Sequence, residues 1–593
     1  MRSRPIDDSV LDPSDPGYRG HSYSTFDFDH AAVEVSGFRP KSSDFVPSLS
    51  VALERSTALG GTVAPKRSHQ RESSSEIHRT TSTRVTAVGL ALLVLVGSAG
   101  FVTLAGAVVP AAPHQSGSKA THNLHTLFLG KTLASGQPSP YCNFASYFGT
   151  GNTPYILLCY TPADLKVAYN FPSDLDGSGQ TVVIVDAFGY PEVQADLNTF
   201  DAMFGLPNTQ VQIVCQSGVC PVFNMNDPDQ VSWSNEIAED VQTVHSLAPG
   251  AHIVLFVATS DDDLTLEQAV LEAVQMFPHS IISQSWGDPE LDMLQGTCFD
   301  DTDNPSGDCS PAYVQETLAT GEQAYRLAAQ EGTTVFASAG DWGADNSGLC
   351  YAFPSPCGFT SANPIYPSSS PWVTAVGGTM GDPYYYLDSI PNCGSAKVCS
   401  VGLVKFLNTP SCQLNVLVPT PPVACTAVGY GGEQVWNEPQ YDFAGGGAPS
   451  LFFGTPWYQS GLGLSARATP DVSADAAASG GGYMYSSSVP SQAGWSESVG
   501  TSFGSPEWSS IAALADQYAA EHHLGPIGFI NPALYLIGEI PALYHLAFHD
   551  ITVGNNTAAG SSVGFNAGPG WDDATGWGTP NVANLVPLLA VLS

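Results

Sequence analysis

The chain has 593 residues, of which 43% are hydrophobic, and a formal net charge of −37. This length and apolar content are enough to bury a sizeable core, which excludes global disorder. With 18 Lys and Arg against 55 Asp and Glu, the chain lacks the clustered positive charge that nucleic-acid binding needs, so we expect no nucleic-acid partner.

The acidic charge is confined to one part of the chain. Residues 1–84 hold 11 basic and 11 acidic residues, so residues 85–593 hold the remaining 7 basic and 44 acidic ones. The uncharged, largely apolar run 85–109 is long enough to cross a bilayer as a helix. Because basic residues precede it, we expect residues 1–84 to face the cytoplasm and the rest to lie outside.

We therefore interpret 1–84 as a disordered cytoplasmic leader, 85–109 as a transmembrane signal anchor and 110–152 as a linker. The protein would then be a single-pass protein of the cell membrane, with release by cleavage left open. A buried core helix and a cleaved signal peptide are the alternatives for 85–109. An ordinary signal peptide has no leader of this length, unless the start codon is misassigned.

Cysteine usage agrees with export. All 12 cysteines lie between Cys142 and Cys425, and their even number favours disulfides in an oxidising compartment. No Cys-x-x-Cys pair is present, which argues against a zinc site. Spacing does not fix the connectivity, but sequential pairing would join 142/159, 215/220, 298/309, 350/357, 393/399 and 412/425.

Strand and helix patterns alternate along the exported part. Buried-strand patterns at 181–185, 253–256, 280–283 and 334–337 alternate with helical patterns at 191–204, 264–276 and 311–330. This order predicts an α/β domain with a parallel sheet flanked by helices, and sites at the carboxyl ends of its strands. The stretch near 382–430 is rich in Pro, Tyr and Cys, and we interpret it as a disulfide-tied surface insertion.

Ser502 is a candidate nucleophile. It follows Gly500-Thr501 and precedes Pro506 and an apolar helical run, so its hydroxyl is expected at a helix N-terminus. Backbone N–H groups and the helix dipole favour developing negative charge there. The alternative is a plain N-cap serine.

A serine nucleophile needs a base, and carboxylates are the candidates here. Glu236 and Asp240 are four residues apart beside an apolar helical stripe, so both lie on one face of the helix. Two close carboxyls push their pKa values apart, which leaves one protonated and the other available as a base. A solvated acidic face is the alternative, and spacing does not exclude Glu239 as the partner. A His-based subtilisin is the nearest rival, but no histidine has the Gly-rich setting it would need.

These motifs occur in an order that resembles the sedolisin family, the serine-carboxyl peptidases. The similarity runs from about Tyr160 to the C-terminus and implies that residues 153–593 form a subtilisin-like domain. It rests on Glu236 with Asp240, Leu247-Ala248-Pro249-Gly250-Ala251, Ser285-Trp286-Gly287, Ser338-Ala339-Gly340-Asp341, and Gly500-Thr501-Ser502 with Pro506.

The resemblance implies an acid-active serine-type endopeptidase. Ser502 would be the nucleophile, Glu236 the general base and acid, and Asp240 the residue that orients Glu236. Asp341 would stabilise the oxyanion, and Ser285-Trp286-Gly287 resembles the strand that pairs with the substrate backbone. The chemistry suits acid, because at roughly pH 4 a Glu still exchanges protons while a His base is protonated.

The C-terminal stretch resembles the calcium site of the same family. Two loops offer carboxylates, and their glycines expose backbone carbonyls, which are the oxygen ligands that Ca²⁺ prefers. Two polar loops without metal are the alternative. The ligands that the resemblance implies for one structural Ca²⁺ are the side chains of Asp550 and Asp572 and the carbonyls of Ile551, Gly568 and Gly570.

The chain departs from the family in one respect that bears on activation. Sedolisins carry a large N-terminal prodomain, and the roughly 40 residues between position 109 and the start of the similarity are too few for one. We expect a monomer that acts on protein or peptide substrates. The alternative is a surface-exposed pseudoenzyme that serves as a binding or adhesion module, although none of the four catalytic positions is lost.

Overall fold

The computed structural model describes residues 121–122, 141–144, 155–295, 310–346, 361–381, 396–407, 409, 426–478, 480–489 and 493–593. The predicted leader 1–84 and anchor 85–109 lie outside these residues. Within the described segments, no helix is both long and apolar enough to cross a membrane.

A mostly parallel sheet forms the centre of the domain. Its strands follow the order β15-β11-β9-β7-β4-β6-β5, with β18 also paired to β11. Only β15 runs antiparallel to its neighbour. The strands are β4 (Thr181–Ala187), β5 (Gln212–Cys215), β6 (His252–Ala258), β7 (Ile281–Gln284), β9 (Thr334–Ser338), β11 (Thr374–Gly381), β15 (Glu433–Val435) and β18 (Val472–Asp475).

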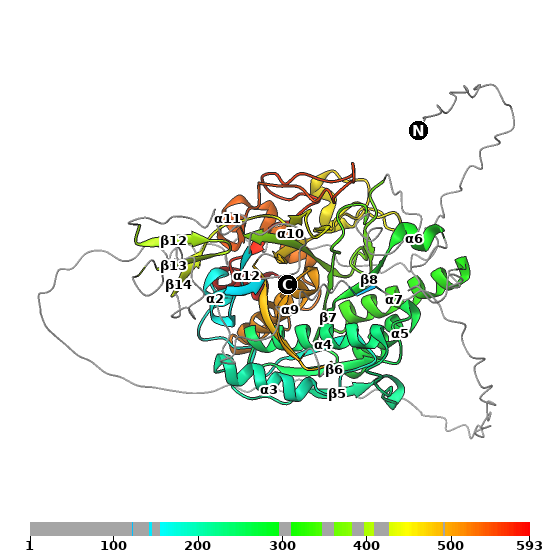
Figure 1. Ribbon diagram of the computed structural model, residues 1–593. Coiled ribbons are helices and arrows are strands. Elements are labelled where there is room, and N and C mark those ends of the chain that lie inside the picture. The colour runs from blue at the N-terminus through cyan, green and yellow to red at the C-terminus, as the bar shows by residue number, and fades with distance from the viewer. Residues whose placement is uncertain are drawn as a thin grey trace, which may run out of the picture. The chain divides into compact units, whose positions relative to one another are not determined.

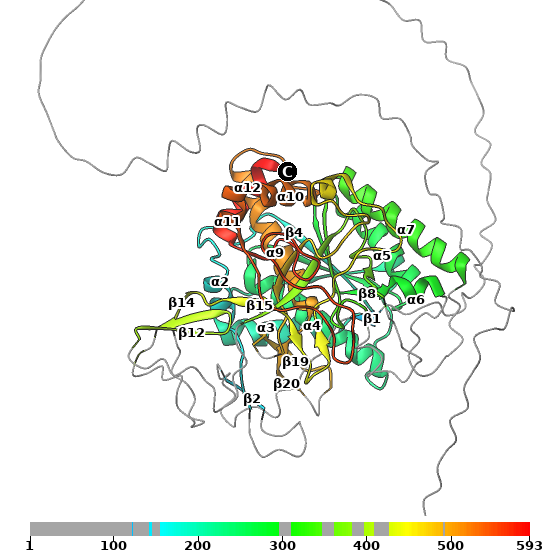
Figure 2. The ribbon, with the colours of Figure 1, turned by 90° about the horizontal axis from the view of Figure 1, so that it is seen from above.

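Helices cover both faces of this sheet, which confirms the predicted α/β class (Figures 1 and 2). Alternate residues of β4 serve opposite faces, because strand side chains have a period of two. Val182 and Ile184 pack in one buried cluster with α4 and α9, whereas Val183 and Val185 pack in another with α5 and α7. The helices are α3 (Val193–Phe204), α4 (Pro228–Leu247), α5 (Asp263–Met276), α7 (Pro311–Gln330), α9 (Thr501–Glu521) and α12 (Val582–Leu592).

Smaller elements surround this frame. The strands β1 (Thr121–His122) and β2 (Tyr141–Phe144) fall within the predicted linker, and β1 pairs with β8 (Trp286–Pro289). The other small elements are α2 (Pro162–Ala168), α6 (Glu290–Gln295), α10 (Asn531–Glu539), α11 (Pro541–Ala547), β3 (Tyr155–Leu158), β10 (Ile365–Tyr366), β12 (Val398–Val401), β13 (Val404–Leu407), β14 (Ala427–Tyr430), β16 (Asn437–Glu438), β17 (Phe443–Ala444), β19 (Gly482–Ser486), β20 (Gly494–Ser498), β21 (Phe548–His549) and β22 (Thr579–Pro580), with the 3-10 turns η1 (Gln216–Gly218) and η2 (Trp457–Leu462).

The described part of the predicted insertion forms a three-stranded antiparallel sheet, β12-β13-β14, beside α2 (Figure 1). Leu403 and Val404 are fully buried in the main apolar cluster, so this stretch contributes to the core as well as to the surface. The predicted disulfide Cys215–Cys220 is confirmed. Cys159 and Cys399 are also disulfide-bonded, and no cysteine is free among the described residues.

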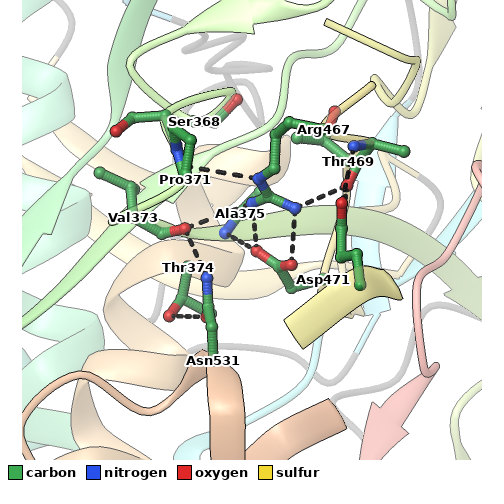
Figure 3. A network of polar contacts seen from close by, with 12 residues as sticks. Ser368, Pro371, Val373, Thr374, Ala375, Arg467, Thr469, Asp471 and Asn531 are labelled. Atoms are coloured by element: carbon green, nitrogen blue, oxygen red, sulfur yellow. Dashed lines mark hydrogen bonds and ion pairs between the residues drawn. The ribbon is translucent and has the colours of Figure 1, made fainter. Parts of the chain in front are cut away.

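A buried ion pair holds the start of β11 (Figure 3). The guanidinium of Arg467 donates to both carboxylate oxygens of Asp471, at 2.7 and 2.5 Å, and both side chains are fully buried. Asp471 also accepts from the Ala375 backbone N–H at 2.8 Å and from the Tyr535 hydroxyl at 2.8 Å. The network therefore connects the loop that carries Arg467 and Asp471, the helix α10 that carries Tyr535, and the first residues of β11.

Candidate active site

Polar residues gather at the carboxyl ends of the parallel strands, where the sequence predicts the site. Asp186 lies near the end of β4, Ser285 directly follows β7, and Asp341 lies in the turn after β9. Ser502 is the second residue of α9 and therefore lies at a helix N-terminus, as the sequence predicts. Gly500, which precedes the helix, has a φ of 104°, a conformation that favours glycine.

A chain of polar contacts links Ser502 to α4. The Ser285 hydroxyl donates to Asp240 at 2.9 and 3.1 Å from its two carboxylate oxygens, and the Ser502 hydroxyl donates to the Ser285 carbonyl at 3.4 Å. The Ser502 hydroxyl is also close enough to the Glu236 carboxyl to lower its pKa by hydrogen bonding. The structure thus brings together the serine and both predicted carboxyls of α4.

The carboxyls of this site are fully buried, so the predicted alternative of a solvated acidic helix face is wrong. Burial raises the pKa of Glu236 well above its usual range, and the charges of Asp240, Glu239 and Asp186 raise it further. The pKa of Asp240 is raised by burial and then by Asp186, while its hydrogen bond from Ser285 opposes the rise. Crowded carboxyls in a water-excluded site hold protons that exposed carboxyls would release.

Asp341 is held in a defined orientation beside the helix N-terminus. Its Oδ1 accepts from the Thr501 backbone N–H at 2.8 Å and from the Thr501 hydroxyl at 2.7 Å. Its Oδ2 is buried and has no hydrogen-bond partner among the described residues. Burial raises the pKa of Asp341 to about 7, against the effect of the two bonds from Thr501. In acid the carboxyl is therefore protonated, and Oδ2 is the oxygen left to donate.

The predicted substrate strand is β8, which begins at Trp286. The Trp286 side chain is buried, and its indole N–H donates to the Val185 carbonyl at 2.7 Å. A Cβ on Gly287 would meet Ile365 and the Tyr366 carbonyl oxygen, each at 2.4 Å. Both residues are thus held in place by contacts within the domain.

The predicted metal residues also come together. The Gly570 backbone N–H donates to Asp550 Oδ1 at 3.0 Å, and the Gly568 backbone N–H donates to Asp572 Oδ2 at 2.8 Å, so one glycine loop joins the two carboxylates. Asp573 adds a buried oxygen without a hydrogen-bond partner among the described residues. This donor set consists of oxygen atoms and fits Ca²⁺. No cluster of three or more His, Cys, Asp or Glu side chains suited to a metal occurs in the part of the chain that the structure describes, so backbone carbonyls would have to complete the site.

Sequence reasoning missed one carboxyl of the active site, Asp186, and left the role of a second, Glu239, open. Asp186 is fully buried and burial raises its pKa to about 8, and its charge acts on both Glu236 and Asp240. Its place at the end of a strand was the available signal. Glu239 is fully buried, and both its carboxyl oxygens lack hydrogen-bond partners within the described segments. Its neighbours on α4 did not distinguish it from a surface residue.

Comparison with known proteins agrees with this geometry. The profile described as the Subtilase family matches residues 230–526, half of the chain. Kumamolisin of Bacillus sp. (strain MN-32) is 29% identical over 71% of this chain and 62% of its own length. Sedolisin of Pseudomonas sp. (strain 101) is 28% identical over 72% of this chain and 60% of its own length. The chain therefore spans less than two thirds of the length of each of these two relatives.

The fold is shared with a solved structure of the same group. Pseudomonas sedolisin, described as a serine-carboxyl proteinase in complex with two molecules of pseudo-iodotyrostatin, superposes with a TM-score of 0.52 and 25% sequence identity. The superposition covers 73% of this chain and 98% of that one. The expected subtilisin-like arrangement of sheet and helices is confirmed.

Proposed function

Because the chain belongs to the subtilase family, within the sedolisin group of serine-carboxyl peptidases, we propose that it is an acid-active endopeptidase with Ser502 as its nucleophile. The observation that carries the proposal is the position of Ser502 at a helix N-terminus, beside Asp341 and next to Ser285, which bonds to the buried Asp240 carboxyl of α4. A serine, a base in hydrogen-bonding reach and an oxyanion donor are the parts that acyl transfer needs.

The proposed reaction begins when Glu236 accepts the proton of the Ser502 hydroxyl as the oxygen attacks the peptide carbonyl. Glu236 then returns the proton to the leaving amine, and water completes hydrolysis of the acyl-enzyme by the same route. Asp240, fixed by Ser285, orients Glu236 and biases where the shared proton resides.

Asp341 would stabilise the tetrahedral intermediate with the proton on Oδ2. A donor of this kind typically contributes about 2.7–4 kcal/mol to transition-state stabilisation. Since the pKa of Asp341 is about 7, this contribution is present in acid and is lost as the pH rises through neutrality. The proposal therefore requires activity below pH 7.

The test is an assay of the purified chain on an unfolded protein substrate from pH 2 to 8. Ser502→Ala and Glu236→Gln should each abolish cleavage. Ser510→Ala, a buried serine two turns further along α9, is the matched control and should retain it. Activity that persists in Ser502→Ala, or a maximum at neutral pH, would contradict the proposal. Labelling of Ser502 by a peptide aldehyde at acid pH separates it from the alternative of a binding module.

We further propose one structural Ca²⁺ on the C-terminal loops. The side chains of Asp550 and Asp572 and the carbonyls of Ile551, Gly568 and Gly570 would hold it, supported by the glycine loop that joins the two carboxylates. Bound Ca²⁺ would supply positive charge that stiffens these loops and would take no part in catalysis.

We also propose that residues 153–593 act outside the cell as a monomer, attached to the cell membrane through 85–109. The disulfide Cys215–Cys220 and the disulfide-bonded Cys159 and Cys399 support an oxidising compartment.

A further inference from the structure

A second set of carboxyls lies where α9 packs on the central sheet. Glu433 belongs to β15, Asp475 is the last residue of β18, and Glu507 lies in α9, the helix that carries Ser502 near its start. Asp475 and Glu507 are fully buried, and the partly buried Glu433 directs its carboxyl into hydrogen bonds within the domain. We call these three residues the carboxyl cluster.

The side chain of Tyr169 joins two members of the cluster. Its hydroxyl donates to Glu433 Oε1 at 2.8 Å and accepts from the Asp475 backbone N–H at 2.9 Å. Thr379, which lies opposite Asp475 in the pairing of β11 with β18, also donates to Glu433 Oε1, at 2.6 Å. Thr579 donates to the other oxygen of Glu433. The carboxyl of Glu433 is therefore held beside the end of β18.

Glu507 lies on a helix that approaches the sheet closely at this point. A Cβ on Gly504, one turn before Glu507, would meet the Ala474 side chain at 3.5 Å. The indole N–H of Trp508 donates to the Ser473 carbonyl at 3.0 Å. Both carboxyl oxygens of Glu507 are buried and have no hydrogen-bond partner among the described residues. An ionised Glu507 would therefore have neither water nor a donor to stabilise it.

No cation compensates the charge of the cluster. In the part of the chain that the structure describes, no Lys, Arg or His lies within ion-pair distance of its three carboxyls. Burial is the main cause that raises the pKa of each, and the charge of Glu433 raises the pKa values of Asp475 and Glu507 further. The hydroxyls around Glu433 and the Ala477 backbone N–H beside Asp475 oppose this rise in pKa.

Few other titratable groups face the cluster. They are Tyr169, Tyr430 and Glu497. Of the elements packed on α9, β7, β9, β11 and α12 carry no titratable side chain. The helix α4 and the strand β4 contribute the carboxyls near Ser502, which act on one another. The protonation of the cluster is therefore controlled by its own members and by burial.

We propose that the carboxyl cluster is a pH-dependent switch for α9: while Glu433, Asp475 and Glu507 are protonated, the helix stays packed on β11 and β18, and loss of their protons at neutral pH releases it. Stability from groups with a raised folded pKa is complete below their unfolded pKa, near 4, and is lost as the pH rises through the folded pKa. The consequence for catalysis rests on the proposed function: release of α9 would displace Ser502 and inactivate the enzyme. Acid stability would then depend on residues that take no part in cleavage.

Glu507→Leu and Glu507→Gln test the switch, because neither side chain ionises and the glutamine keeps the shape of the native one. In the Ser502→Ala chain, where no self-digestion interferes, the rate of unfolding in a fixed concentration of urea is followed by tryptophan fluorescence at pH 4 and 7.5. We expect the ratio of the rate at pH 7.5 to the rate at pH 4 to fall roughly tenfold or more in both variants, since one unit of pKa shift is a factor of ten in the equilibrium. Glu521→Leu, at the exposed end of α9, removes the same charge and is the matched control, for which the ratio should not change.

A double-mutant cycle tests whether the carboxyls act on one another. Asp475→Asn alone should also lower the ratio of the two unfolding rates. Combined with Glu507→Leu, it should lower the ratio by less than the product of the two single effects, because each change removes repulsion that the other residue feels.

Hydrogen exchange tests whether α9 is the element that is released. After a shift of the Ser502→Ala chain from pH 4 to 7.5, and with the intrinsic pH dependence of exchange taken into account, the amides of residues 507–519 should lose protection before those of α5. Glu507→Leu should abolish this difference between the two helices.

The outcomes separate this inference from the proposed function, because the structural measurements use the Ser502→Ala chain. A rate ratio in both Glu507 variants equal to that of Glu521→Leu would overturn the inference, as would independent effects of Asp475→Asn and Glu507→Leu. Loss of protection in α9 and α5 at the same time would show general unfolding and also overturn it. A chain with this switch but without cleavage in acid would refute the endopeptidase proposal alone, whereas cleavage in acid without the switch would refute this inference alone.

Discussion

Asp341→Asn tests whether burial, rather than a fixed partner, controls the protonation of the site. The change keeps an acceptor oxygen for Thr501, whose N–H and hydroxyl both donate to Asp341 Oδ1, and removes the ionisable group. Burial raises the pKa of Asp341 from its ordinary value of 3.8 to about 7, and the side chain is fully buried. Between pH 3.8 and about 7, Asp341 therefore stays protonated in the folded protein, whereas it has lost this proton in the unfolded chain.

The sign and size of the effect follow from this difference. Stability contributed by a group with a raised folded pKa is complete below about pH 4 and is lost as the pH rises towards 7. A rise of about three pH units, at 1.36 kcal/mol each, corresponds to roughly 4 kcal/mol of unfolding free energy. Asp341→Asn should abolish that part of the pH dependence. The unfolding free energy of the variant, relative to that of its parent, should therefore increase by about 4 kcal/mol between pH 4 and 7.

The measurement is urea unfolding at pH 4, 5.5 and 7, followed by tryptophan fluorescence in the Ser502→Ala background to prevent self-digestion. Asp174→Asn, on an exposed side chain, is the control for a change of net charge. If the Asp341→Asn chain and its parent lose stability in parallel, then Asp341 is not protonated in the folded protein, and its role as an acid-form oxyanion donor fails as well.

Three further predictions concern other parts of the molecule. Glu239→Leu should raise the free energy of unfolding at pH 7 by about 1–3 kcal/mol, because it removes a buried carboxyl without hydrogen-bond partners among the described residues. In the same variant, a retained kcat would exclude Glu239 as the partner of Ser502, and a lost kcat would support that role. Arg467→Met should cost about 3–5 kcal/mol in urea unfolding by leaving Asp471 buried without its cation, and an unchanged midpoint would contradict that account. Chelation with EDTA should lower the melting temperature if Ca²⁺ binds at Asp550 and Asp572, whereas an unchanged melting temperature refutes the metal proposal.

The regular part of the fold was predictable because its hydrophobic pattern is strong. The helix expected at 311–330 is α7, Pro311–Gln330, and the strand expected at 334–337 is β9, Thr334–Ser338. Both are bounded by local signals: Ser310 caps α7 with Pro311 as its first residue, and a turn separates the two elements. The position of Ser502 at a helix N-terminus was equally predictable, because Gly500, the polar Thr501 and the later Pro506 mark the start of the helix in the local sequence.

Contacts between distant segments could not be predicted in this way. The strand β1 has two residues and no pattern, and only its partner β8 makes it a strand. The ion pair of Arg467 and Asp471 has helical spacing, but neither residue lies in a helix, so the sequence does not distinguish it from two surface charges. Such features depend on what the remainder of the chain places opposite them.

Buried carboxyls are the third kind of feature that the sequence conceals, because Asp and Glu in a sequence usually indicate surface. Away from the active site, Asp475 and Glu507 are fully buried, and the Glu507 side chain has no hydrogen-bond partner among the described residues. Burial raises the pKa of both, and the nearby Glu433 raises each further. These groups, like those around Ser502, are compatible with the fold as neutral acids.

The charge composition explains why neutral acids are needed. Residues 85–593 hold 7 basic residues against 44 acidic ones, and the guanidinium of Arg467 is already committed to Asp471. The groups that shift the pKa of Glu236 are accordingly other carboxyls and a serine hydroxyl, with no cation to oppose burial. A carboxyl buried without a cation stays folded at low cost only while it is protonated. Burial raises the pKa of the active-site carboxyls, and the shortage of Lys and Arg leaves that rise unopposed. Acid is therefore expected to favour both the stability of the fold and the proposed catalysis.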